Sequence, residues 1–419
     1  MKTKICVIGA GLGGLSAGIR LANKGFEVDL YEQNSTPGGK AGEIKEMGYR
    51  FDTGPSLLTM PQVIKDLFSE CGENIDDYLS INRLELICKY FYPDGSIINA
   101  YSDQDKFGKE IDEKTSDNSA SLDKYLTYCK TIYELAGDLF LTKDPSSVST
   151  YLNSKALKTL LNVGKIDPFR TINEANESFF KDQRLVQLFN RYATYNGSNP
   201  YLAPATLNII PHVEYNQGSF IPVGGIYSIS KALYKLAEKK GVNISLNQKV
   251  DKIILENKEV KAIKVNDKII KYDKIISNVD VNFTFKNLIK NFESRESRRY
   301  EKKLPSFSGL VFYWGIKKEF PELETHNILF SKNYKKEFDD LFENKTIHND
   351  PTVYIYISSK LNKDDAPSEK ENWFVMVNAP HIQNQNWDSE VNTARKNVVK
   401  KINNFLNTDI ESLIEFEKI

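Results

Sequence analysis

The first forty residues alternate between short apolar runs and an amphipathic stretch. The apolar run from Lys4 to Ile8 predicts a buried strand, and a second run from Phe26 to Tyr31 predicts another. Between them, apolar residues at helical spacing predict a helix that ends near Lys24. Strand, helix and strand in this order indicate a βαβ unit at the start of a parallel sheet.

Further along, the pattern changes to mixed strands and helices. Pro61 begins a predicted helix, and two strands, Leu84–Tyr92 and Ser96–Tyr101, form a predicted hairpin. We expect the polar residues Asp103–Ser121 to form a loop or a poorly ordered entry to the next helices, and Leu122–Tyr192 to be mostly helical.

After Pro222 a helix runs to Gly241 and is followed by strands. Lys274–Asn278 reads as a strand that returns the chain to the first sheet. The other expected elements are the strands Val242–Leu246, Val250–Leu255, Val260–Val265, Ile269–Ile270, Gly309–Gly315, Val353–Ile357 and Trp373–Val377, and the helices Asn333–Phe342 and Ser389–Phe405.

A glycine-rich turn joins the first strand to the first helix. Gly9, Gly11 and Gly14 have the spacing G-x-G-x-x-G, in which the glycines allow a tight turn, close approach to a pyrophosphate and tight helix packing. The pyrophosphate then lies at a helix N-terminus, where free N–H groups favour an anion. Glu32 ends the second strand, where an acid accepts hydrogen bonds from ribose hydroxyls. These residues predict a dinucleotide site.

A second flexible turn follows Glu32. Pro37–Gly42 contains Gly38 and Gly39, which expose backbone, and one cation, Lys40. Such a turn suits the phosphate or ribityl region of a long cofactor, which favours a flavin over a nicotinamide.

Composition excludes several other classes of protein. The chain has 419 residues, 40% of them hydrophobic, which is enough for two domains. Its 56 basic and 56 acidic residues balance, which argues against a nucleic-acid binder. The four cysteines and four histidines are dispersed without metal-ligand spacing, so we expect no metal and no disulfide framework. No apolar run reaches the roughly 20 residues that span a bilayer.

Three segments carry a resemblance to a known family. Gly9–Gly42, Tyr49–Ser56 and Arg191–Thr206 resemble the bacterial phytoene desaturase family of carotenoid-forming flavoproteins and, more distantly, amine oxidases. Lys40 stands where that family usually has arginine. The resemblance implies an α/β fold, in which a Rossmann-type FAD-binding domain is combined with a discontinuous α+β substrate domain, as in the amine oxidase and glutathione reductase-like flavoproteins. It places the FAD-binding domain at 1–83 and 204–280 and the substrate domain at 84–203 and 281–419.

The resemblance also implies site residues and partners. The strand around Val250 supplies backbone contacts to the adenine in such flavoproteins. The expected FAD-binding residues are Gly9, Gly11, Gly13, Gly14, Glu32, Gly38, Gly39, Lys40, Pro55, Ser56 and Val250. The implied reaction is FAD-dependent desaturation of phytoene or a related, hydroxylated carotene, with oxygen or a quinone as electron acceptor. No residue is identified as the catalytic acid or base.

Two features bear on the substrate and on the membrane. Ser154–Lys165 is amphipathic with a basic side, which fits either a membrane interface or a surface helix packed on the core. Tyr192 and Tyr195 fit either an aromatic wall for a long apolar substrate or a closed core. With a lipophilic polyene as substrate, we expect a cytoplasmic protein in peripheral contact with the inner face of the membrane.

Alternatives share these motifs. A polyene cis–trans isomerase, an amine oxidase and a non-catalytic remnant all fit the same residues. The family pattern ends with a glycine-rich turn and a helix that closes over the flavin, and no such turn occurs before Ile419. The resemblance therefore implies a truncated chain or a fragment whose first sheet lacks a partner strand and leaves the flavin site open to water.

Overall fold

A computed structural model of the chain describes residues 2–137, 161–289, 294–303 and 305–419, together with positions 139, 141, 143 and 159. The chain divides into two compact units. Unit 1 comprises Met1–Lys45, Asp52–Asn82 and Phe220–Leu304, and unit 2 comprises Glu46–Phe51, Arg83–Ser219 and Pro305–Ile419.

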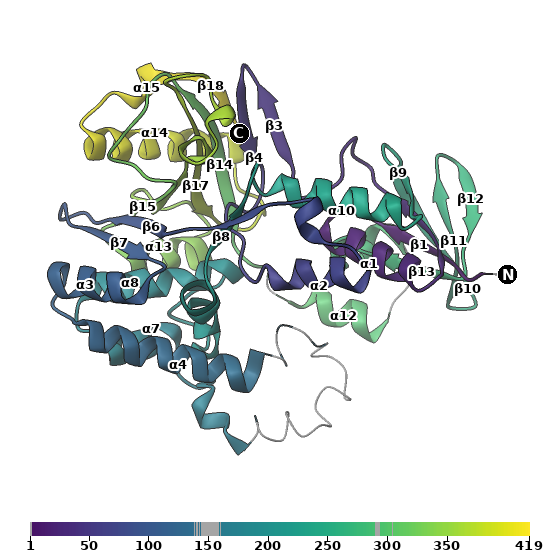
Figure 1. Cartoon of the computed structure of the whole chain (residues 1–419), viewed down its shortest axis with the longest axis horizontal. Helices are drawn as coiled ribbons and strands as arrows, with labels where there is room; N and C mark the ends of the chain where they lie inside the picture. Colours follow the sequence, from purple (N-terminus) through teal and green to yellow (C-terminus); the bar gives the residue numbers. More distant parts are fainter. Residues whose placement is uncertain are drawn as a thin grey trace. The chain divides into compact units, whose positions relative to one another are not determined.

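Unit 1 is built on a four-stranded parallel sheet in the order β13-β1-β2-β9 (Figure 1). Its strands are β1 (Lys4–Ile8), β2 (Glu27–Tyr31), β9 (Asn243–Ser245) and β13 (Lys274–Ser277). β1 is central because Cys6, Val7 and Ile8 are apolar and buried, as both sides of a covered parallel sheet require. The predicted return strand is confirmed as β13, which pairs with β1.

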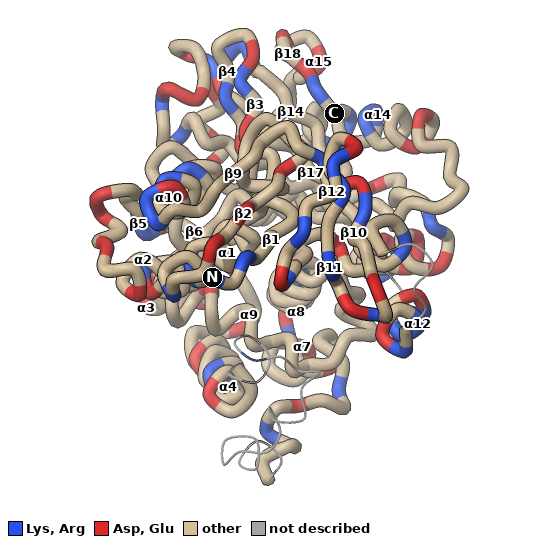
Figure 2. The backbone as a smooth tube through the Cα atoms, turned by 90° about the vertical axis from the view of Figure 1, so that its right-hand side faces the viewer, with Lys and Arg blue, Asp and Glu red and all other residues tan. Residues whose placement is uncertain are grey.

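Helices cover this sheet. α1 (Leu12–Asn23) buries Leu15 and Ile19 and packs beside α10 (Tyr227–Lys239), which buries Leu233 and Leu236, in one core. α2 (Gln62–Glu70) adds Leu67 and Phe68 to that core. A three-stranded antiparallel sheet, β10 (Val250–Glu256), β11 (Glu259–Val265) and β12 (Lys268–Lys271), completes the main elements of unit 1, and Figure 2 shows basic and acidic positions interspersed along it.

Unit 2 is built on a seven-stranded mixed sheet in the order β18-β14-β17-β16-β15-β6-β7. Its strands are β6 (Leu86–Phe91), β7 (Ile97–Tyr101), β14 (Ser308–Ile316), β15 (His326–Leu329), β16 (Val353–Tyr356), β17 (Glu371–Ala379) and β18 (Ile414–Lys418). The predicted hairpin is confirmed as β6 and β7. β15 and β18 were not predicted.

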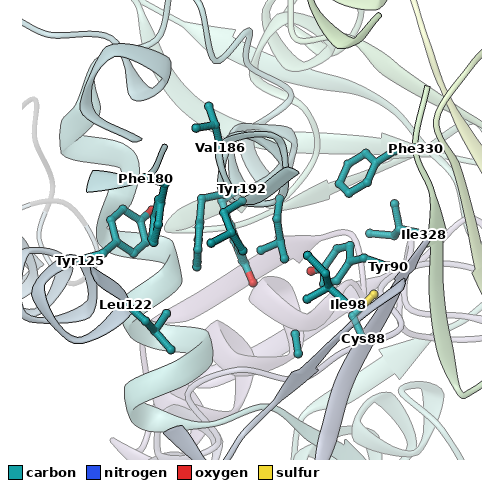
Figure 3. Close-up of a cluster of buried hydrophobic side chains, with 14 of the residues drawn as sticks. Cys88, Tyr90, Ile98, Leu122, Tyr125, Phe180, Val186, Tyr192, Ile328 and Phe330 are labelled. Carbon is teal, nitrogen blue, oxygen red and sulfur yellow. The ribbon is translucent and has the colours of Figure 1, made fainter. Parts of the chain in front are cut away.

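Two large cores lie in the part of unit 2 that the structure describes. One joins Trp314 and Trp373 to α14 (Trp387–Leu406). The other joins β6 and β7 to the helices α3 (Gln104–Lys114), α4 (Ser119–Gly137) and α8 (Gln183–Asn190). In the view of Figure 3, Tyr192 lies between Phe180 and Tyr90 in this second core. The remaining α-helices of more than five residues in the described part are α7 (Ile172–Phe179), α12 (Arg295–Glu301) and α13 (Tyr334–Asp339).

The prediction of a polar loop over Asp103–Ser121 is wrong. Most of this segment is α3, and α4 begins at Ser119. Asp103 caps α3 by accepting a hydrogen bond from the Lys106 N–H at 2.8 Å. Phe107 and Ile111, four residues apart on one face, are fully buried and hold the helix on the core despite its charged surroundings.

The unit boundaries differ from the predicted ones at three places. Phe51 packs on Tyr313 and Phe416, which puts residues 46–51 in unit 2. Tyr215 stacks on Phe107, which puts residues 204–219 in unit 2 as well. Residues 281–304 belong to unit 1, where Leu288 packs in the core around Val250.

The membrane prediction concerns a segment that is mostly not described. Ser154–Lys158 and Leu160 lie outside the described residues, so the predicted amphipathic helix Ser154–Lys165 stays a prediction. Among the helices that the structure describes, none is long and apolar enough to cross a bilayer.

Candidate functional site

The carboxyl ends of the four parallel strands in unit 1 meet at one pocket. Gly9 follows β1, Glu32 follows β2, Gln248 lies beyond β9 and Asn278 follows β13. Open parallel sheets bind ligands at this edge of the sheet. The pocket has a volume of about 650 Å³, within the range of small-molecule and cofactor sites.

The glycine turn has the geometry that its spacing predicts. Gly9 adopts a positive φ of 95°, and its N–H donates to the Tyr31 carbonyl at 2.8 Å. A Cβ on Gly14 would lie 1.9 Å from the Gly9 carbonyl oxygen, so no side chain fits where the helix leaves the turn. A Cβ on Gly13 would lie 2.7 Å from the Asn278 side-chain nitrogen. Gly9 and Gly11 line the pocket, whereas Gly13 and Gly14 shape the turn behind it.

The second turn packs directly on the first. The Gly38 N–H donates to the Ala10 carbonyl at 2.8 Å, and Gly38 pairs with Gly11 as an isolated parallel bridge. A Cβ on Gly39 would lie 3.3 Å from the Gly11 Cα. The two glycine segments, about thirty residues apart along the chain, thus form one wall of the pocket with exposed backbone.

Glu32 is buried next to the first glycine turn. One carboxylate oxygen accepts from the Ala10 N–H at 2.8 Å and the other from the Asn34 N–H at 2.9 Å. Each carboxylate oxygen has two lone pairs, so each keeps one acceptor position for a ligand hydroxyl. Glu32 lines the pocket and is 5% exposed.

The remaining predicted residues separate into two groups. Lys40, Pro55 and Val250 line the pocket, with Lys40 exposed to solvent and Val250 buried at the start of β10. Ser56 is half-buried and does not line it.

Several lining residues were missed by the sequence analysis. The Asn278 side-chain oxygen accepts from the Gly14 N–H at 2.8 Å, while the Asn278 N–H donates to the Ile8 carbonyl at 2.8 Å. Asn278 therefore holds the glycine turn against β1. Gln248, Lys249, Val279 and Asp280 also line the pocket. Their position just beyond strands of the parallel sheet is the signal that would have found them.

The pocket residues fit a dinucleotide. Two backbone segments without Cβ atoms and one exposed lysine suit a pyrophosphate, and the buried carboxylate of Glu32 suits a ribose. The apolar side chains of Ile8, Val250 and Leu288 offer contacts for an adenine ring. The described residues thus present acceptors, donors and apolar surface in one pocket.

The two tyrosines of unit 2 differ in their surroundings. Tyr192 is 1% exposed and belongs to the core, whereas Tyr195 is 44% exposed. The closed-core interpretation therefore holds for Tyr192 but not for Tyr195.

Comparison with known proteins shows the family. Residues 12–307 match the family described as flavin containing amine oxidoreductase. A 1-hydroxycarotenoid 3,4-desaturase from Flavobacterium sp. (strain P99-3) is 40% identical over 416 residues, which cover 99% of this chain and 84% of the relative. A 4,4'-diaponeurosporene oxygenase from Staphylococcus haemolyticus (strain JCSC1435) is 33% identical, covering 100% of this chain and 83% of the relative.

A solved structure has the same fold. Wild-type putrescine oxidase bound to putrescine superposes with a TM-score of 0.65 at 12% identity, covering 100% of this chain and 84% of the oxidase. The expected amine oxidase-type α/β fold is therefore confirmed. The chain belongs to the flavin-containing amine oxidoreductases, within the carotenoid desaturase family, and is an FAD-dependent oxidoreductase.

Proposed function

We propose that this protein desaturates a hydroxylated carotene. The observation that carries the proposal is the 40% identity, over 99% of the chain, to a protein named 1-hydroxycarotenoid 3,4-desaturase. Desaturation of phytoene itself, the other substrate that the family resemblance implies, stays a prediction.

The residues of unit 1 provide the cofactor site. Bound FAD would supply the hydride acceptor for one substrate carbon, and loss of a proton from the neighbouring carbon would complete the new carbon–carbon double bond. In our proposal Glu32 holds the ribose, the backbone of Gly9, Gly11 and Gly39 holds the pyrophosphate with Lys40, and Val250 contacts the adenine. Asn278 and Gly14 keep the turn in the shape that this binding needs.

Peripheral membrane contact is part of the proposal because a carotenoid partitions into lipid. Exposed apolar side chains on neighbouring segments of unit 2 support it: Phe169 is 85% exposed and Leu202 is 75% exposed. Their segments are joined by a hydrogen bond from the Ala205 N–H to the Arg170 carbonyl at 2.8 Å. We place this surface on the inner face of the membrane, with oxygen or a quinone as electron acceptor.

The function is tested with the purified chain, loaded with FAD and incubated without oxygen with a 1-hydroxylated carotene in liposomes. The expected result is bleaching of the flavin bands together with a red-shifted polyene spectrum, because each new double bond lengthens the conjugated system. A terminal aldehyde or alcohol that forms only when oxygen and a reductant for the flavin are supplied would support the second candidate, oxygenation, which the diaponeurosporene oxygenase relative favours. A changed isomer ratio without net bleaching would instead indicate an isomerase.

The membrane surface is tested by changing Phe169 and Leu202 together to serine. The double change removes two apolar side chains that would be buried in the lipid. It is expected to lower vesicle binding at least tenfold, because each such side chain contributes about 1.5–3 kcal/mol when fully buried. Ile382→Ser is the matched control, since Ile382 is 76% exposed elsewhere in unit 2. Equal vesicle sedimentation of all three proteins would exclude this surface.

A further inference from the structure

One face of the seven-stranded sheet of unit 2 carries a row of four aromatic side chains. Tyr313 on β14 lies 5.6 Å from Phe374 on β17, centroid to centroid. Phe374 lies 6.5 Å from Tyr356 on β16, and Tyr356 stacks on His326 of β15 at 4.9 Å. The row, which we call the aromatic wall, crosses four neighbouring strands.

A buried charged group lies next to the His326 end of this wall. β6, which pairs with β15, carries Tyr90, and the Tyr90 hydroxyl accepts from an Arg191 nitrogen at 2.9 Å. The Arg191 guanidinium also lies over the Tyr192 ring at 4.4 Å and is 3.5 Å from the Glu214 carboxylate. We call Tyr90, Arg191, Tyr192, Tyr195 and Glu214 the Arg191 cluster.

Glu214 has no exposed surface, and two tyrosine hydroxyls donate hydrogen bonds to its carboxylate. The Tyr192 hydroxyl donates to one carboxylate oxygen at 2.6 Å, and the Tyr195 hydroxyl donates to the other. Desolvation and the Glu214 charge raise the pKa of both tyrosines well above the ordinary value, so both keep their protons. Because the Tyr195 proton is committed to Glu214, the remaining capacity of the Tyr195 oxygen is to accept a hydrogen bond.

The Arg191 cluster and the adjacent His326 end of the aromatic wall each contain a buried nitrogen without a partner in the part of the chain that the structure describes. Nε of Arg191 and Nε2 of His326 are buried and have no hydrogen-bond partner among the described residues. Unpaired buried donors or acceptors of this kind are rare in native proteins.

Exposure distinguishes Tyr195 from Tyr192. Both donate to the same carboxylate, but Tyr192 is closed in the core and Tyr195 is 44% exposed. Tyr195 is thus the most exposed member of the Arg191 cluster.

We propose that the Arg191 cluster binds a hydroxyl group at the end of the polyene substrate. The substrate hydroxyl donates to the Tyr195 oxygen, which donates in turn to Glu214, and Arg191 balances the carboxylate. This inference rests on the proposed function and assigns a specificity site to it. The site selects substrates with a hydrogen-bond donor at one end.

The test compares a 1-hydroxylated carotene with the same polyene lacking the hydroxyl, in the wild type and in Tyr195→Phe. The expected wild type prefers the alcohol in kcat/KM by about tenfold, the equivalent of one hydrogen bond. Tyr195→Phe is expected to raise KM for the alcohol by about the same factor and to leave kcat and the flavin spectrum unchanged. Glu214→Gln, which keeps the shape but removes the charge, is expected to weaken the preference in the same direction.

Tyr128→Phe is the matched control, because the Tyr128 hydroxyl donates to another carboxylate, that of Asp167, at 2.8 Å. Its preference for the alcohol should equal that of the wild type. If the wild type converts both polyenes equally well, or if Tyr195→Phe slows both equally, the assignment of the hydroxyl site is overturned while the desaturase function stands. If the wild type converts neither, the proposed function itself has failed.

Discussion

At the scale of single residues, Glu32 lines the cofactor pocket and is held in place by backbone. Each of its two carboxylate oxygens accepts a hydrogen bond from a backbone N–H group. Glu32→Ala is expected to weaken FAD binding by about 1.5–3 kcal/mol, because a charge-assisted acceptor for the ribose is lost. Titration of the apoprotein with FAD, followed by flavin fluorescence, measures the change. Glu27→Ala, at the exposed first residue of β2, serves as the control. If Glu32→Ala binds FAD as tightly as the wild type, the proposal that Glu32 holds the ribose is wrong.

His326 makes the stability of unit 2 depend on pH. Burial, together with the nearby Arg191 charge, lowers the pKa of His326 to about 3. In the unfolded chain histidine titrates near pH 6.5, so between pH 6.5 and 3 the unfolded state binds one more proton than the folded state. The stabilisation is complete above pH 6.5, and the free energy of unfolding falls by about 1.4 kcal/mol for each pH unit below it.

Urea unfolding from pH 7 to pH 5 checks this prediction. His326→Phe keeps an aromatic ring beside Tyr356 but cannot titrate, so its unfolding free energy should decline less steeply with acid than that of the wild type. If the unfolding free energies of the wild type and of His326→Phe decline equally with acid, His326 takes up its proton as readily in the folded protein as in the unfolded chain.

At the scale of secondary-structure elements, α3 depends on its N-cap residue, Asp103. Asp103→Ala removes the cap on the Lys106 N–H and is expected to destabilise unit 2 by about 1 kcal/mol. Glu113→Ala, exposed near the other end of α3, should change stability much less. Chemical denaturation of both variants measures the change. If Asp103→Ala leaves the free energy of unfolding unchanged, burial of Phe107 and Ile111 is enough to hold the helix.

The elements differ in how well the sequence predicts them. β1, α1 and β2 were predictable because their apolar pattern and the glycine spacing lie within one short segment. α3 was missed because two apolar side chains, Phe107 and Ile111, are its main contact with the core and charged residues surround them. β15 and β18 are short and pair with strands far away in the chain, so no local pattern marks them.

The same distinction holds for the site. Gly9, Gly11 and Glu32 belong to a local motif, and the structure brings them to one pocket as expected. Asn278 and Gln248 reach that pocket only because β13 and β9 pair with the first βα unit, more than 200 residues away. Pairing over such a separation is set by the sheet as a whole and not by residues near Asn278.

At the scale of the whole molecule, the division of the cores predicts an uneven response to loss of the cofactor. Each of the larger buried clusters belongs to one unit, and the pocket is lined by residues of unit 1. FAD at 100 times its dissociation constant would stabilise the unit that binds it by about 2.7 kcal/mol. Removing FAD is therefore expected to make unit 1 more sensitive to protease than unit 2, as mapped by mass spectrometry of early cleavage sites. Cleavage that increases equally in both units would contradict a site confined to unit 1.

The strand order β13-β1-β2-β9 also has a consequence for synthesis of the chain on the ribosome. The two strands that carry the glycine turn and Glu32 leave the ribosome first, but their partners on both sides come from residues 243–277. At about 5–20 residues per second, the first βα unit waits on the order of ten seconds or longer with the outer edge of each of its two strands unpaired. A newly made chain therefore acquires its cofactor late, and the early part of this sequence is where a holding chaperone has the most time to act.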